Sequence, residues 1–269
     1  MNNITKWQPT KIKYQGDKFC VNQSGVAPGS LYYTLEDFRA IDSVKTYLKG
    51  HLVDLGCGNV PYYQWYKDCV EQITCVDWSQ GAHDDSFVDV FADLNQSLPL
   101  ADRSVDSVFS TSVLEHICEP LVLLREIARI LKPNGYVILS VPFTYPLHEE
   151  PFDYYRYTPY SLQHLADKAG LKVVCLKHCG SGFGVLVDVT ARIGQTLMGT
   201  VSRLMPKYVG LLINKLGTVL LRLFQRTCYE ILKQKQVLQI IDRANLSGKI
   251  ALGYVVVLQA PDPDESMPS

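Results

Sequence analysis

The eight cysteines of this sequence show none of the spacings that metal centres and redox motifs use. No C-x-x-C pair occurs, and Cys175 and Cys179 have no second pair that would complete a zinc site. Residues 1–50 also lack the compact apolar segment of a secretory signal peptide. We therefore expect reduced thiols that are mostly buried, no structural disulfide and no metal centre.

Long apolar runs and an excess of charge of one sign are also absent. No stretch of about 18 apolar residues occurs, so a membrane-spanning helix is not expected. The 26 Lys and Arg residues nearly balance the 27 Asp and Glu residues, and the net charge of −1 disfavours a general nucleic-acid binder. We expect a cytoplasmic protein, in which 47% hydrophobic residues supply a sizeable core. The 269 residues suit one large domain, with or without an insertion.

Short apolar runs alternate with helical patterns from residue 51 onward, as in β-α-β units. Strands are predicted at residues 51–56, 72–78, 105–111, 136–142, 171–177 and 254–259, and helices at 31–49, 121–132 and 159–169. This order predicts an α/β fold with a mostly parallel sheet and helices on both faces. We assign residues 1–30 to an irregular N-terminal arm, 31–182 and 250–260 to the α/β domain, and 261–269 to a disordered tail.

The remaining segment, residues 183–249, is predicted to be a basic, amphipathic helical insertion before the last strand. Its part from 183 to 235 has eight Lys or Arg and two Asp or Glu, a net charge of +6 that leaves −7 for the rest of the chain. Within it, residues 209–226 combine a broad apolar face with a narrow polar stripe of Lys215, Thr218, Arg222, Gln225 and Arg226. Such a helix can pack on its own domain as a lid, lie on a membrane surface, or form a homodimer contact.

The sharpest local signal is the sequence VDLGCGN at residues 53–59, in which a buried strand runs into a tight glycine turn. Gly56 and Gly58 allow the backbone to turn sharply and to approach a ligand closely. Asp77 follows at the end of the next strand, where doubly wound folds bind a ribose through a carboxylate. A dinucleotide fingerprint would need a third glycine, but this position is Pro61. The pattern therefore favours an adenosine ligand without phosphates, such as S-adenosylmethionine.

Together these segments resemble the class I S-adenosylmethionine-dependent methyltransferases of the type 11, ubiquinone-biosynthesis-like group. The resemblance lies in VDLGCGNVPYY (53–63), CVDWS (75–79) and the stretches 91–120, 124–143 and 148–171. It implies a Rossmann-like seven-stranded sheet with the helical insertion between strands six and seven. The cofactor-binding residues that it implies are Asp54, Gly56, Cys57, Gly58, Asp77, Trp78, Asp93, Leu94, Ser110 and Thr111.

The loop after the strand at 136–142 is rich in charged and aromatic residues and is a candidate acceptor site, since ligands of open α/β sheets bind beyond the carboxyl ends of strands. Candidate catalytic residues are His148, as a general base, and Asp153; candidate substrate-binding residues are Tyr145, Arg156 and Tyr157. Alternatively, Asp153 pairs with Arg156 and caps the following helix. His116, with its neighbour Glu115, is expected to brace its loop.

The implied reaction is methyl transfer to a small or lipid-linked acceptor, more readily on oxygen than on carbon or nitrogen. A glycan-related hydroxyl is the favoured acceptor by resemblance to methyltransferases that accompany cell-surface glycan synthesis. Association with the inner membrane surface and a homodimer are left open. Two other classes are also possible: an NAD-dependent oxidoreductase or epimerase, and a catalytically idle cofactor-binding module.

Overall fold

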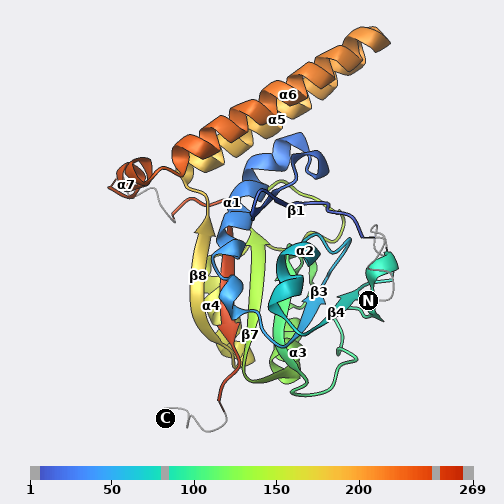
Figure 1. Cartoon of the computed structure of the whole chain (residues 1–269), viewed down its shortest axis with the longest axis vertical. Helices are drawn as coiled ribbons and strands as arrows, with labels where there is room; N and C mark the ends of the chain where they lie inside the picture. Colours follow the sequence, from blue (N-terminus) through green and yellow to red (C-terminus); the bar gives the residue numbers. More distant parts are fainter. Residues whose placement is uncertain (1–6, 80–84, 244–248, 263–269) are drawn as a thin grey trace.

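The computed structural model describes residues 7–79, 85–243 and 249–262, and its centre is a sheet with helices on both faces (Figure 1). In chain order the strands of this sheet are β3 (His51–Leu55), β4 (Gln72–Asp77), β5 (Val90–Phe91), β6 (Val105–Thr111), β7 (Leu131–Pro142), β8 (Lys172–Cys179) and β9 (Gly253–Gln259). Their spatial order is β5-β4-β3-β6-β7-β9-β8. Within this sheet, β9 runs antiparallel to both of its neighbours. The predicted seven-stranded, mostly parallel α/β fold is confirmed.

Alternate residues of the central strands supply two hydrophobic cores on opposite faces of the sheet. Val53 and Leu55 of β3 pack with residues of α3 (Pro120–Ile130) and α4 (Pro159–Ala169). Leu52 packs on the other face with residues of α1 (Leu31–Asp42) and α2 (Tyr63–Tyr66). Burial on both faces fixes the register of the strands, and so fixes which loops meet at their carboxyl ends.

The first 50 residues differ from the prediction in two places. The helix expected at 31–49 ends at Asp42, where the Ser43 hydroxyl donates to the Ala40 carbonyl at 2.6 Å and competes with the helical hydrogen bonds. The arm expected to be irregular contains a hairpin of β1 (Ile12–Gln15) and β2 (Lys18–Val21). Gly16 and Asp17 both have positive φ values, which suit the tight turn between these strands.

The observed boundaries can be compared with the expected ones at three further places in the chain. The edge strand β5 has two residues, too few to produce a recognisable pattern in the sequence. Helix α3 ends at Ile130, two residues before the expected boundary. Most of the tail expected at 261–269 lies outside the described residues.

Between β8 and β9, α5 (Gly182–Leu204) and α6 (Lys207–Leu232) form a long helical hairpin that projects away from the sheet, followed by α7 (Lys235–Arg243) (Figure 1). The two long helices approach closely where glycines face the partner helix. A Cβ at Gly217 would lie 2.0 Å from the Met198 sulfur, and one at Gly210 would lie 2.3 Å from the Ser202 carbonyl oxygen. Contacts through small residues of this kind allow two helices to pack along their length.

Candidate active site

The glycine loop between β3 and α2 is fixed to the neighbouring strand β4. The backbone N–H groups of Gly56 and Cys57 donate to the Val76 carbonyl at 2.8 and 3.2 Å. Gly56 and Gly58 have φ values of 68° and 50°, a conformation that side chains with a Cβ rarely adopt. A Cβ at Gly56 would also lie 2.4 Å from a methyl carbon of Val113. The loop therefore has both the shape and the residue type expected of a cofactor-binding turn.

Asp77 lies at the end of β4 and meets this loop. One of its carboxylate oxygens accepts the Gly58 N–H at 2.5 Å, and the other accepts the Trp78 N–H at 2.6 Å. The Cys57 sulfur lies 3.9 Å from the same carboxylate. The Trp78 ring is partly exposed and lies perpendicular to the Phe152 ring, with the ring centres 5.6 Å apart. The expected ribose-binding acid is therefore adjacent to the glycine turn, although 19 residues separate Asp77 from Gly58 in the chain.

Asp54 differs from Asp77 because it is buried. Its carboxyl accepts a hydrogen bond from the Tyr66 hydroxyl at 2.7 Å. Burial raises the pKa of Asp54 to about 7; the Tyr66 hydrogen bond opposes this shift, and the nearby Asp77 carboxylate adds to it. A carboxyl group with a raised pKa at the base of a glycine loop is typical of a binding site, because titratable groups with shifted pKa values cluster at functional sites.

The remaining expected cofactor residues follow β5 and β6. Asp93 is exposed, and its carboxylate accepts the backbone N–H of Asn95 at 2.9 Å in a tight turn, whereas Leu94 is buried. Ser110 is buried and donates to the Leu55 carbonyl at 2.9 Å, which ties the ends of β3 and β6 together. Thr111 is the last residue of β6 and is half-buried. All of these residues lie at the carboxyl edge of the sheet. They surround its topological switch point, from which the chain connections run in opposite directions along the sheet.

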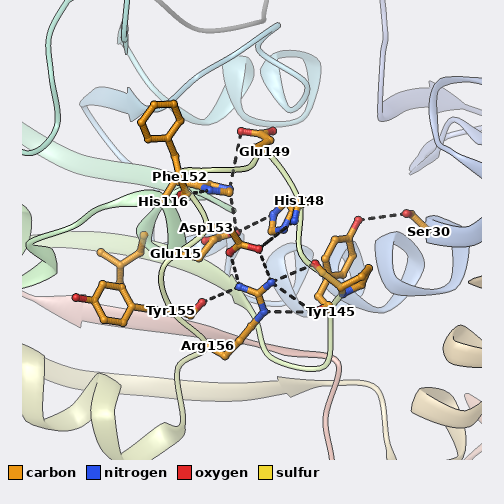
Figure 2. A network of polar contacts seen from close by, with 12 residues as sticks. Ser30, Glu115, His116, Tyr145, His148, Glu149, Phe152, Asp153, Tyr155 and Arg156 are labelled. Atoms are coloured by element: carbon orange, nitrogen blue, oxygen red, sulfur yellow. Dashed lines mark hydrogen bonds and ion pairs between the residues drawn. The ribbon is translucent and has the colours of Figure 1, made fainter.

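A second polar cluster lies where the loop after β7 meets the short helix η7 (Leu114–His116) after β6 (Figure 2). Nε2 of His148 lies 3.7 Å from the Glu115 carboxylate, and Nδ1 of the same ring lies 3.2 Å from the Asp153 carboxylate. Contact with Glu115 raises the pKa of His148, burial opposes this shift, and Asp153 adds to it. His116 stacks edge-on against His148, with the ring centres 4.7 Å apart. Glu115 and His116 were expected only to brace their loop, and their signal in the sequence is the V-L-E-H motif.

Arg156 and Asp153 form the pair that was predicted as an alternative to catalysis. Two guanidinium nitrogens contact the two carboxylate oxygens at 2.6 and 2.7 Å, and Arg156 also donates to the carbonyls of Tyr145, Pro146 and Tyr155. The guanidinium holds the pKa of Asp153 well below its usual range. Asp153 accordingly positions His148 and is a poor proton acceptor. The pair does not cap α4; Thr158 does, because its hydroxyl accepts the Ser161 N–H.

The two tyrosines expected to bind the acceptor have different environments. The Tyr145 hydroxyl lies 3.2 Å from the Ser30 hydroxyl, and its ring contacts His148 and the Arg192 guanidinium. Tyr157 is 3% exposed and donates to the Leu114 carbonyl at 2.9 Å. Its side chain belongs to the core, so the prediction of acceptor contact is corrected for Tyr157, and Tyr145 is the tyrosine that borders the site.

A shallow hollow of about 470 Å³ lies beside Tyr145, between the loop after β7 and helix α5. It is lined by Phe143, Thr144, Tyr145, Pro146, Asp188, Val189, Arg192 and Ile193. Its position joins the polar cluster to the base of the helical hairpin. The hollow therefore continues from Tyr145 along α5.

Comparison with known proteins agrees with this geometry. Residues 53–139 match the family model described as a methyltransferase domain. A malonyl-[acyl-carrier protein] O-methyltransferase from Alcanivorax borkumensis is 32% identical over 110 residues, 37% of this chain and 37% of that protein. An uncharacterized methyltransferase from Mycobacterium bovis is 50% identical over 44 residues, 16% of this chain and 17% of that protein. The chain thus matches little more than a third of the length of these curated relatives at most.

One solved structure has the same fold over nearly its whole length. The "putative sarcosine dimethylglycine methyltransferase" from Galdieria sulphuraria superposes with a TM-score of 0.50 at 16% identity, covering 96% of this chain and 95% of that one. At this identity the likeness extends to the fold alone.

Proposed function

We propose, from the premise that residues 53–139 form a class I methyltransferase domain of the family they match, that this protein transfers a methyl group from S-adenosylmethionine to an oxygen acceptor. The observation that carries the proposal is the contact between Asp77 and Gly58 at the carboxyl edge of β3 and β4. A carboxylate beside a glycine turn suits the hydroxyl groups of a ribose. Asp54 and Asp93 add carboxyl groups at the same edge, for the methionine and adenine ends of the cofactor.

The chain's own residues would mainly align the acceptor and exclude water. When bound, the cofactor supplies a methyl group already activated by a sulfonium. Catalysis then depends on the position of the acceptor and, for a hydroxyl, on removal of its proton. His148 is the residue that we place against the acceptor oxygen, because it is 24% exposed and lies beside Tyr145 and the hollow along α5. Asp153 and Arg156 would hold this loop in position.

We further propose that the acceptor is small or lipid-linked and carries a glycan-related hydroxyl. The tyrosines and charged groups of the loop after β7 suit hydrogen bonding to a hydroxylated compound. The A. borkumensis relative is named as an O-methyltransferase, which supports oxygen as the methylated atom over the 37% of that protein that this chain matches.

The helical hairpin supports a lipid-linked acceptor. Large apolar side chains along both helices are exposed, among them Leu186, Ile193, Leu197, Leu204, Tyr208, Leu211, Leu212, Leu216, Leu220 and Leu223. Helix amphipathicity was predicted, but the apolar face points away from the protein, and Gln225 of the polar stripe is buried against α1. Such a continuous apolar surface marks an interaction site.

We propose that this surface lies on an anionic membrane. Residues 183–235 carry a net charge of +6, which would attract anionic lipids and would repel a second copy of the same hairpin. Arg203 and Lys207 flank the turn at its tip, beside the exposed Leu204 and Tyr208. No helix among the described residues has the length and hydropathy to cross a bilayer, so the contact we propose is interfacial.

The cofactor assignment is tested by calorimetry with S-adenosylhomocysteine. We expect binding by the native chain and at least tenfold weaker binding by Asp77→Ala, since a carboxylate hydrogen bond contributes roughly 1.5–3 kcal/mol. Asp68→Ala, which changes an exposed acid outside the site, is the matched control and should bind normally. Binding of NADH in place of S-adenosylhomocysteine would identify an oxidoreductase or epimerase. Cofactor binding without methyl transfer to any hydroxylated acceptor would favour an idle module.

A further inference from the structure

The Glu115 carboxylate is fully buried, and within the described residues neither of its oxygens has a hydrogen-bond partner. Burying a carboxylate without donors is costly, so buried carboxylates are normally paired or bound to a metal ion. The groups that face it are two imidazole nitrogens, Nε2 of His116 at 3.8 Å and Nε2 of His148 at 3.7 Å. Both distances are too long for a hydrogen bond.

These distances fit pairs of ligand atoms that share one bound ion. Ligand atoms that each lie about 2.0–2.2 Å from a metal ion are separated from one another by roughly 3–4 Å. The three ligand atoms of Glu115, His116 and His148 all lie within 4.8 Å of one another. They come from η7 and from the loop after β7, two segments that meet at the carboxyl edge of the sheet (Figure 2).

The surroundings of both histidines leave Nε2 available to a metal. Nδ1 of His116 lies 2.9 Å from the Phe152 carbonyl, to which it can donate only as the protonated nitrogen. Nδ1 of His148 faces Asp153 at 3.2 Å without meeting hydrogen-bond geometry, and Arg156 holds that carboxylate within reach of it. A carbonyl or carboxylate on the far nitrogen is the usual support of a metal-binding histidine, since it fixes the tautomer and the ring orientation.

We propose that Glu115, His116 and His148 bind a divalent transition-metal ion. Two imidazoles and one carboxylate suit Zn²⁺, Mn²⁺, Co²⁺ or Fe²⁺, whereas Mg²⁺ and Ca²⁺ prefer oxygen ligands throughout. The side chains of His116 and His148 are 14% and 24% exposed, so the site opens toward solvent on one side. A Glu149 carboxylate oxygen lies 3.9 Å from Nε2 of His116 at this open side.

The chemical use of the ion rests on the proposed function, but the ion then replaces His148 as the group that meets the acceptor oxygen, since Nε2 of His148 is a ligand of the ion. An acceptor hydroxyl bound at the open side would lose its proton to solvent more readily, because the ion stabilises the resulting alkoxide. An electron pair of this oxygen then forms the bond to the methyl carbon. The carbon–sulfur bond breaks at the same time, and its electron pair converts the sulfonium to a neutral thioether.

Metal binding can be measured without any methyl transfer. The full chain is freed of metal with a chelator and titrated with Co²⁺, and the visible absorption spectrum is recorded. We expect one ion per chain and bands typical of nitrogen and oxygen ligands. Glu115→Gln, which keeps the shape of the side chain, should weaken binding at least tenfold, and His148→Ala more. His164→Ala, at an exposed histidine of α4, is the matched control and should bind normally.

Two results would overturn the metal site. One is unchanged Co²⁺ affinity in a folded Glu115→Gln variant. The other is a strong thiolate-to-cobalt band in the native chain, which would assign the ion to some of the eight cysteines. The native-chain spectrum decides the question even if a variant does not fold. Because S-adenosylhomocysteine binding is measured separately, failure of the metal site and failure of the proposed function are distinguishable.

Discussion

Gln225 on α6 accepts the backbone N–H of Tyr32 on α1 at 2.9 Å and donates to the Pro28 carbonyl at 2.6 Å. Its side chain is fully buried, whereas leucines on other sides of the same helix are exposed. The hairpin is therefore attached to the domain through polar contacts with the start of α1, where the first backbone N–H groups of a helix need external partners. Its apolar face remains free along most of its length.

Replacing Gln225 should loosen the base of the hairpin. In Gln225→Leu the Tyr32 N–H stays buried without an acceptor, which costs about 1–3 kcal/mol of unfolding free energy. Urea unfolding followed by circular dichroism would measure this loss. Gln236→Leu, at an exposed position of α7, serves as the control and should change stability by less than about 0.5 kcal/mol. Equal stability of the two variants would show that Gln225 does not anchor the hairpin.

Asp54 should make the protein less stable as the pH rises. Its pKa is raised from 3.8 to about 7 by burial, so the folded state binds more protons than the unfolded state between these values, and unfolding free energy falls with pH across that window. Asp54→Asn removes this titration and keeps an acceptor for Tyr66. We expect the variant's stability relative to the native chain to increase from pH 4 to pH 7.5 by a few kcal/mol, at roughly 1.4 kcal/mol per pKa unit.

The Tyr66→Phe variant provides an independent check on this interpretation. Removing the hydrogen bond to Asp54 takes away the contribution that lowers its pKa, so the pH-dependent loss of stability should extend to higher pH. Parallel stability curves for the native chain and Asp54→Asn across the whole range would contradict the buried, titrating Asp54.

The grouping of the glycine turn with Asp54 and Asp77 could be predicted from sequence because its signals are local. The glycines and Asp54 follow one apolar run, Asp77 ends the next, and a parallel sheet places the carboxyl ends of adjacent strands together. The same rule brings the loops after β6 and β7 to one edge of the sheet, but it does not place Glu115 against His148. These residues are far apart in the chain, and their contact depends on the paths of two irregular loops. Tyr157 was misplaced for the same reason: alternation between core and site within a loop follows no fixed period.

The insertion shows a different limit. Its periodicity correctly predicts an amphipathic helix, but periodicity does not say which face meets the protein. The buried face was decided by backbone groups near residue 30, nearly 200 residues earlier in the chain, which needed the polar atoms of Gln225. Gln225 therefore marks the face of α6 that meets the domain, and the leucines lie on its exposed faces.

The ion pair of Arg156 and Asp153 should hold the loop after β7 in place. The side chain of Asp153 is 2% exposed, so removing its partner in Arg156→Met should cost about 3 kcal/mol of unfolding free energy. Arg156→Lys keeps the positive charge but loses the paired hydrogen bonds to Asp153. Its unfolding free energy should therefore lie between those of the native chain and Arg156→Met. S-adenosylhomocysteine affinity should change less than twofold in both, whereas Co²⁺ affinity should fall because His148 loses its orientation. Arg125→Met on α3 is the exposed control; a cofactor-binding loss in Arg156→Lys would contradict this assignment.

The exposed face of α6 should bind anionic membranes. Leu212, Leu216 and Leu220 lie on one side of the helix and are 55%, 56% and 66% exposed. Replacing all three by Gln should weaken binding to vesicles of phosphatidylcholine and phosphatidylserine, measured by sedimentation, by roughly 1,000-fold or more, since each leucine contributes about 1.5 kcal/mol or more on transfer. Unfolding free energy should not decrease, because these side chains lie in water in the free protein.

Controls separate the membrane from a second copy of the chain as the partner. Tyr160→Gln and Val174→Gln, at exposed apolar positions on α4 and β8, should leave vesicle binding intact. Vesicles of phosphatidylcholine alone, or 0.5 M salt, should weaken it, because the net charge of +6 on residues 183–235 then has no anionic surface to bind or is screened. If the native chain stays in the supernatant and instead forms a dimer that the triple variant converts to a monomer, the exposed face is a dimer interface and the membrane proposal is wrong.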